Sequence, residues 1–272
     1  MIQFTRTLLR YHQLIAVMAW KQIVVRYKQS YLGLAWAILK PMMLMLVFTL
    51  LNSFVGISHG SIPYPVLAFT ALIPWIFFQE SISDGVISVV TNAALIRKIY
   101  FPREVFPLTG VLTKLVEFGI NALILGCLMW YFRVVPAATI VWIPLLLLYT
   151  VLAALSIVLL GAAVNVFYRD VGTMLPILLQ LLMYASPVIY PMSLVEKKLS
   201  VDRVAGAWSD LLLYLYRSNP IAGVIDGFQR TILYGQPPSI ATLWPGMIVV
   251  AVLLPISYAV FKRAELHFAD VV

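Results

Sequence analysis

The feature that most limits how this chain can fold is a series of apolar segments of about twenty residues or more. A helix of that length, rising about 1.5 Å per residue, crosses the ~30 Å hydrocarbon core of a bilayer. Hydrophobic residues make up 62% of the chain and charged residues only 11%, whereas about a quarter of the residues of a soluble domain are charged. The sequence therefore predicts an all-α integral membrane protein, with residues 1–272 forming a single transmembrane domain.

The apolar segments predict six transmembrane helices, which places both ends of the chain on the same side of the membrane. Lys and Arg are enriched on the cytoplasmic side of membrane proteins. Eleven of the 19 basic residues fall in segments that this topology assigns to the cytoplasm, and six in segments assigned to the outside. We therefore expect both termini to be cytoplasmic. The expected spans are residues 33–54, 66–90, 108–132, 140–166, 171–189 and 243–261.

Residues 1–32 have the pattern of an amphipathic helix lying on the membrane surface. Val17 and Val24 interrupt the polar face, and Arg26 falls on the apolar one. A basic surface helix directly before the first span also favours a cytoplasmic N-terminus. The expected polar face holds Arg6, Arg10, Gln13, Lys21 and Lys28, and the apolar face Phe4, Leu8, Tyr11, Ile15, Met18 and Ile23.

The segment between the second and third expected spans, residues 91–107, is here called the docking stretch. Arg97, Lys98 and Arg103 make it basic and hence cytoplasmic. Asn92 can cap a short helix over about residues 93–99, which Pro102 ends. The apolar surface expected on this short element is typical of a site where another protein docks. A helix on the membrane surface with its aromatic side chains among the lipid headgroups fits equally well. The apolar residues are Leu95, Ile96, Ile99, Tyr100 and Phe101.

A further short helix is expected within residues 190–242, on the outer side. Asn219 can cap it, Pro220 occupies its first position, and Gly235 follows its end. About fourteen residues give ~21 Å, too short to cross the bilayer. We expect the helix to re-enter the outer leaflet or to lie on it, with residues 211–216 as a descending partner; a surface hairpin is the alternative. Its apolar residues are Ile221, Val224, Ile225, Phe228 and Ile232.

Five charged residues fall inside expected spans, toward their cytoplasmic ends. An ionised side chain at the bilayer centre costs roughly 2.5–3.5 kcal/mol on insertion scales. Two cations and three anions can neutralise most of one another, so structural pairing is favoured over a hydrated vestibule or a proton relay. The residues are Lys40, Glu80, Asp84, Lys114 and Glu117.

Several kinds of chemistry have no motif in this sequence. It contains no G-x-x-x-x-G-K-[ST] phosphate loop and no H-E-x-x-H. Cys127 is the single cysteine, and three histidines are scattered, so we expect no metal site and no cofactor bound by this chain. The basic residues lie at span ends and form no continuous stripe, which indicates membrane topology and not nucleic-acid binding.

Several segments, in the right order along nearly the whole chain, resemble the ABC-2 family of transporter permeases, in its polysaccharide and polyol-phosphate export branch. The segments are R-Y-K-Q-S-Y-L-G-L-A-W-A-I-L-K-P (26–41), N-A-A-L-I-R-K-I-Y-F-P-R-E (92–104), N-V-F-Y-R-D-V (165–171), S-P-V-I-Y-P (186–191), N-P-I-A-G-V-I-D-G-F-Q-R (219–230) and the ending A-E-L-H-F-A-D-V-V.

The resemblance implies a homodimer of six-span subunits in a bacterial inner membrane, with two copies of a separate nucleotide-binding subunit that binds ATP and Mg²⁺. It implies that residues 92–101 form a coupling helix and favours the docking interpretation. It also implies a gate of short external helices within residues 192–233. The residues expected to dock the ATPase subunit are Asn92, Leu95, Ile96, Arg97, Lys98, Ile99, Tyr100, Phe101, Arg103, Glu104, Tyr168, Arg169 and Asp170.

The expected activity is export of a polyprenyl-linked polysaccharide from the cytoplasmic to the outer leaflet. Aromatic side chains can bind sugars loosely, although each candidate fits a membrane-interface position equally well. An ABC-2 exporter of a drug or small lipid, a membrane-embedded transferase of lipid-linked sugars and a structural scaffold are the alternatives. The candidate channel and gate residues are Tyr31, Trp36, Tyr184, Ser186, Pro187, Tyr190, Pro191 and Phe228.

Overall fold

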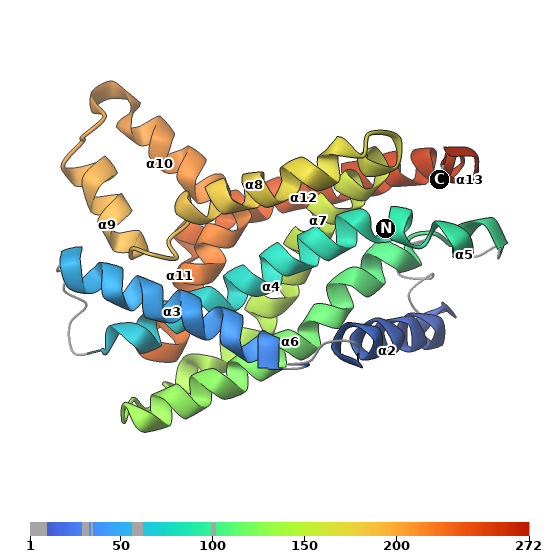
Figure 1. Ribbon diagram of the computed structural model, residues 1–272. Coiled ribbons are helices and arrows are strands. Elements are labelled where there is room, and N and C mark those ends of the chain that lie inside the picture. Colours follow the sequence, from blue (N-terminus) through green and yellow to red (C-terminus); the bar gives the residue numbers. More distant parts are fainter. Residues whose placement is uncertain (1–9, 29–32, 34, 56–61, 99–101, 272) are drawn as a thin grey trace.

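The computed structural model describes residues 10–28, 33, 35–55, 62–98 and 102–271. Its long helices run alongside one another in an elongated bundle (Figure 1). These helices are α2 (His12–Lys28), α3 (Ala35–Val55), α4 (Tyr64–Thr91), α6 (Val105–Tyr131), α7 (Ile143–Phe167), α8 (Asp170–Tyr184) and α12 (Ile240–Glu265). The shorter elements are α5 (Ala93–Lys98), η1 (Ala138–Trp142), α9 (Met192–Glu196), η2 (Lys197–Val201), η3 (Gly206–Trp208), α10 (Ser209–Ser218), α11 (Pro220–Leu233) and α13 (Phe268–Val271).

Five helical segments are long and apolar enough to cross a membrane: α3, α4, α6, residues 138–167 and α12. They agree with five of the six expected spans, and the chain is therefore a multi-pass membrane protein. The fifth expected span, residues 171–189, contains the shorter α8, whose 15 residues give about 22 Å. Pro187 explains the early end, since the residue before a proline disfavours the helical conformation. A sixth crossing stays a prediction.

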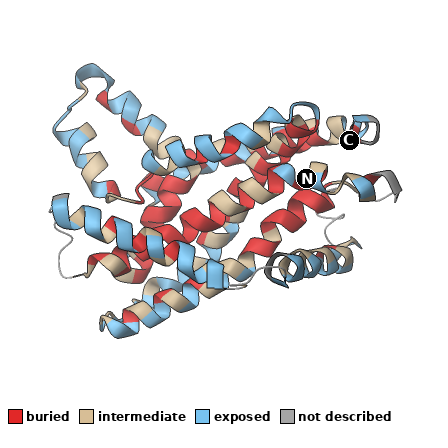
Figure 2. Cartoon of the chain, viewed as in Figure 1, coloured by how far each residue is buried: buried red, intermediate tan, exposed pale blue. Residues whose placement is uncertain are grey.

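Helix α4 forms the centre of the bundle. It packs against α3, α6, α7, α8 and α11, and it is largely buried (Figure 2). Phe69, Trp75 and Phe78 on this helix are fully buried. By contrast, α3 and α8 expose many apolar side chains. A helix that is apolar on its outer face is what a bilayer, and not water, accommodates.

The centre of the bundle is held close by glycines on three helices. A Cβ added at Gly110 of α6 would lie 2.9 Å from Gly85 Cα of α4. A Cβ at Gly161 of α7 would lie 2.6 Å from a methyl group of Val86 on α4. Small residues at such crossings let helix backbones approach, the usual basis of helix association in membranes.

Gly110→Ala is expected to lower stability by about 1–3 kcal/mol, because the atom in the way belongs to a backbone that cannot rotate aside. Gly119, on the same helix, has no neighbouring atom within 4 Å of an added Cβ, so Gly119→Ala serves as the matched control and is expected to be neutral or slightly stabilising. Thermal unfolding of the two purified variants in detergent makes the comparison. Equal unfolding temperatures would contradict the close approach of α4 and α6.

Helix α2 packs on α6 through one apolar face. Ile15 is buried, and Tyr11, Leu14 and Met18 pack against the core. Apolar side chains also lie on its outer side, where Val17 and Trp20 are 66% and 69% exposed. Such a helix presents apolar surface to the bundle and to the surroundings. A helix is thus confirmed over residues 12–28; its position on the membrane surface stays a prediction, and residues 1–9 lie outside the described residues.

Candidate docking and transport regions

The structure brings all five charged residues of the expected spans together in one cluster, here called the charge network. Lys114 of α6 is only 1% exposed, and its Nζ lies 3.1 Å from Asp84 Oδ2 and 3.0 Å from Glu117 Oε1. It also lies 3.3 Å from Glu80 Oε2, and Lys40 of α3 forms a second ion pair with Glu80. The pairing that the sequence suggests is therefore observed, and it links α3, α4 and α6.

The docking stretch contains a short helix, α5, as expected. The backbone carbonyl of Asn92 accepts hydrogen bonds from the amides of Leu95 (3.0 Å) and Ile96 (3.3 Å). Its side-chain amide, however, donates to the backbone carbonyl of Ser88 on α4 at 2.8 Å. Among the described residues, this side chain therefore binds the C-terminal end of α4 and not the start of α5. Ile99, Tyr100 and Phe101 lie outside the described residues, as do the side chains of Arg97 and Lys98.

The expectation that the described part of α5 exposes its apolar residues is wrong for Ile96. Ile96 is only 6% exposed and belongs to the hydrophobic core, and Leu95 is partly buried against it. The reason is tertiary packing: Ile96 belongs to the hydrophobic core, and α5 is contacted by α13, a neighbour that cannot be read from the sequence.

Two further residues of the docking stretch contact the end of α12. Glu104 is fully buried and ion-paired with Lys262, so its carboxylate is not available to a partner protein; this corrects its assignment as a docking residue. The backbone amide of Arg103 donates to Glu265 Oε1 at 3.0 Å, and its guanidinium donates to the backbone carbonyl of Glu265. These two residues hold the stretch in place.

The turn between α7 and α8 holds the second group of expected docking residues. Tyr168 is 70% exposed, and Arg169 and Asp170 are exposed. This turn lies at the same end of the bundle as α5 and α13 (Figure 1). Its surface is open to a partner.

At the opposite end, Asn219 joins two elements. Its Oδ1 accepts from the amide of Ile221 at 3.3 Å, so it caps α11 as the sequence predicts. Its Nδ2 donates to Ser186 Oγ at 2.8 Å. The exit of α8 is thereby attached to the start of α11.

Helix α11 spans Pro220–Leu233, close to the expected range, but it is not a surface hairpin. Most of its residues are buried, and it packs against α4, α7 and α12. Phe228 is 1% exposed, with its ring edge-on to Phe118 at 6.2 Å. Phe228 is therefore part of the hydrophobic core.

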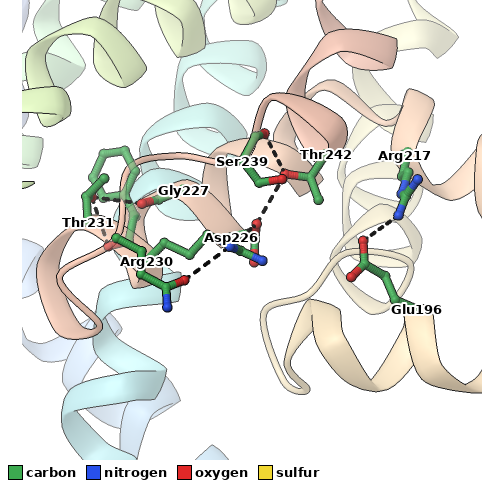
Figure 3. Close-up of polar contacts among 10 residues, drawn as sticks. Glu196, Arg217, Asp226, Gly227, Arg230, Thr231, Ser239 and Thr242 are labelled. Atoms are coloured by element: carbon green, nitrogen blue, oxygen red, sulfur yellow. Dashed lines mark hydrogen bonds and ion pairs between the residues drawn. The ribbon is translucent and has the colours of Figure 1, made fainter.

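The polar residues of α11 form a small cluster with α12 (Figure 3). Asp226 is 7% exposed; it accepts from Arg230 Nε at 2.8 Å and from Thr242 Oγ1 at 3.1 Å. Burial raises the pKa of the Asp226 carboxyl, and Arg230 and Thr242 oppose that shift. The sequence shows the i, i+4 spacing of Asp226 and Arg230, but the partner on α12 could not be found from it.

Residues 192–218, here called the external arm, extend from the bundle as α9, η2, η3 and α10 (Figure 1). Arg217 Nη2 lies 2.6 Å from Glu196 Oε1 and joins α10 to α9 (Figure 3). Apolar side chains of α10, among them Leu211 and Leu215, are exposed. Helix α10 leads directly into the buried α11, so an exposed and a buried helix meet at Asn219.

The other candidate channel residues lie at the end of α8 and in the segment between α8 and α9, except Trp36 of α3 and Tyr31. Trp36 and Tyr184 are about half exposed. Tyr190 donates its hydroxyl to the backbone carbonyl of Tyr184 at 2.8 Å, and Pro191 precedes α9. Ser186 and Pro187 are buried, and Tyr31 lies outside the described residues.

Comparison with known proteins gives consistent results. The O-antigen export system permease protein RfbA of Myxococcus xanthus is 29% identical over 271 residues, covering 99% of both chains. A protein of the same name from Klebsiella pneumoniae is 25% identical, covering 95% of this chain and 94% of its own. The polysialic acid transport protein KpsM of Escherichia coli is 25% identical over 90% of this chain and 91% of its own. Residues 13–201 match the profile of the ABC-2 type transporter family. The chain therefore belongs to the ABC-2 type transporter family.

Proposed function

We propose that this chain is the membrane subunit of an ATP-driven exporter that moves a polyprenyl-linked polysaccharide from the cytoplasmic to the outer leaflet of a bacterial inner membrane. The observation that carries the proposal is the similarity to the Myxococcus xanthus O-antigen export permease along 99% of both chains. Because the similarity extends along the whole length, it includes the docking stretch, the spans and the external arm. The polysialic acid transport protein is related over nine-tenths of the chain, which supports a polymeric glycan as cargo.

The energy source in this proposal is a separate subunit. The chain contains no phosphate loop, so two copies of a nucleotide-binding subunit would bind ATP and Mg²⁺ and act on a homodimer of this chain. The exposed turn of Tyr168, Arg169 and Asp170 supports docking at the end of the bundle that holds α5. Asn92, Leu95 and Arg97–Phe101 remain docking candidates there. Ile96, Arg103 and Glu104 would then support the surface from within.

The topology we propose has six crossings, with both termini in the cytoplasm. Helix α8 and the turn that follows would form the fifth crossing, shortened by Ser186 and Pro187. Helices α10 and α11 would be the external re-entrant pair. The direction of the chain in Figure 1 supports this, since α5 and α13 lie at one end of the bundle and the external arm at the other. The half-exposed Trp36 and Tyr184 fit a channel completed by the second subunit.

Deletion of the gene is expected to remove the polysaccharide from the cell surface and to leave lipid-linked polymer on the cytoplasmic leaflet. Re-expression of the chain should restore the surface polymer, whereas re-expression in cells whose ATPase subunit cannot hydrolyse ATP should not. The measurement is antibody labelling of intact cells against labelling of permeabilised cells. Undiminished surface polymer in the deletion strain would contradict the proposal.

A further inference from the structure

The C-terminal segment, residues 262–271, is attached to the docking stretch by polar contacts. The buried carboxylate of Glu104 pairs with Lys262, and Lys262 also pairs with Glu265 at 2.8 Å. Glu265 in turn accepts from Arg103 through its side chain and its backbone carbonyl. Separating these partners would leave a buried carboxylate without its cation, which is strongly unfavourable. The start of α6 and the end of α12 therefore form one unit.

The same segment is attached to the turn between α7 and α8 by aromatic contacts. Phe268 of α13 is fully buried. Its ring lies 5.4 Å from that of Phe261 on α12, edge-on, and 6.3 Å from that of Phe167. Phe167 is the last residue of α7, directly before Tyr168. Helix α13 also contacts α5, so the end of the chain touches both regions that we assign to ATPase docking.

The other end of α12 packs closely against α11. A Cβ added at Gly223 of α11 would lie 2.6 Å from Thr242 O, and one added at Gly246 of α12 would lie 3.0 Å from Pro220 Cα. Thr242 also donates to Asp226. These contacts leave α11 little freedom to move independently of α12.

We propose that α12, together with the C-terminal segment, connects the cytoplasmic docking region to α11, so that a displacement at the docked ATPase subunit reaches the external helices through one continuous helix. This inference rests on the proposed function, since it needs a docked ATPase. Glu265 and Phe268 are positioning residues in this connection: they touch neither nucleotide nor cargo and hold the docking stretch and the α7–α8 turn against α12. The neighbouring Leu266 is 76% exposed and has no part in it.

The test uses the complete transporter with its ATPase subunit in proteoliposomes, and it measures polymer exported per ATP hydrolysed. Glu265→Ala and Phe268→Ala are expected to lower this ratio about fivefold or more, the lower range of coupling between distant sites, while the complexes stay assembled and hydrolyse ATP. Phe268→Leu should restore most of the ratio because it keeps an apolar side chain in the contact. Leu266→Ala is the matched control and should leave the ratio unchanged.

A loss of stability alone would lower export and ATP hydrolysis together and leave their ratio unchanged; such a result overturns the connection. An unchanged ratio in assembled Glu265→Ala and Phe268→Ala complexes overturns it as well. If Phe268→Ala fails to assemble, Glu265→Ala decides, since the Glu265 side chain, at 16% exposure, is less buried than that of Phe268. Absence of ATP-driven export in the unaltered transporter would instead refute the proposed function.

Discussion

Lys114→Met is expected to destabilise the protein by about 3–5 kcal/mol, the cost of removing one partner from a buried ion pair. The methionine would fill much of the space of the lysine side chain, so the loss comes from charge. Glu80, Asp84 and Glu117 would keep their positions around a group that no longer carries a cation. Uncompensated carboxylates are costly inside a bilayer. We therefore expect the spans to pack less tightly around them.

The measurement is thermal unfolding of the purified variants in detergent, together with the amount of inserted protein in membranes. Lys40→Met is the control, because Lys40 is 53% exposed and pairs only with Glu80 among the described residues; its effect should be about 1 kcal/mol or less. Lys114→Arg should recover part of the stability by keeping the charge. Equal stability of Lys114→Met and the unaltered protein would show that the charge network does not hold α4 and α6 together.

The double variant Tyr168→Asp, Arg169→Glu is expected to abolish ATP-dependent export and to lower retention of the ATPase subunit by tenfold or more, roughly the effect of losing two central interface contacts. Both side chains are exposed, so the fold should not change. Co-purification of the ATPase subunit and the unfolding temperature are measured on the same samples.

Lys197→Glu, on the exposed surface of η2 at the opposite end of the bundle, is the charge-reversal control and should retain the ATPase subunit fully. Normal retention and export in the Tyr168, Arg169 variant would remove this turn from the docking surface. A substitution such as Leu95→Asp is a less clean test, because Leu95 is partly buried against the core and its replacement would also disturb packing.

Local chemistry made much of the fold predictable. Apolar length alone located five of the long helices to within a few residues, since the bilayer thickness fixes their minimum length. Asn219 and Pro220 predicted the start of α11, because an N-cap and a first-turn proline act within a few residues of the chain. Pro187 carries the signal for the early end of α8, but the apolar pattern continues past it and led to a longer expected helix.

The rest depends on contacts that sequence spacing does not encode. Arg103 and Glu265 are 162 positions apart, and α5, which holds the buried Ile96, is contacted by α13 from the far end of the chain. The docking stretch therefore looked like an exposed apolar surface although part of it is a packing surface. The charges of the spans were identifiable as a set that needed pairing, whereas the central place of Lys114 among three carboxylates follows only from how α4 and α6 cross.

The most direct measurement of the central claim is export of labelled lipid-linked polysaccharide in proteoliposomes containing this chain, with and without its ATPase subunit. Our account predicts that export requires both proteins and hydrolysable ATP, and that it stops when the ATPase subunit binds but cannot hydrolyse nucleotide. Export at the full rate by this chain alone, or with a hydrolysis-deficient subunit, would contradict it.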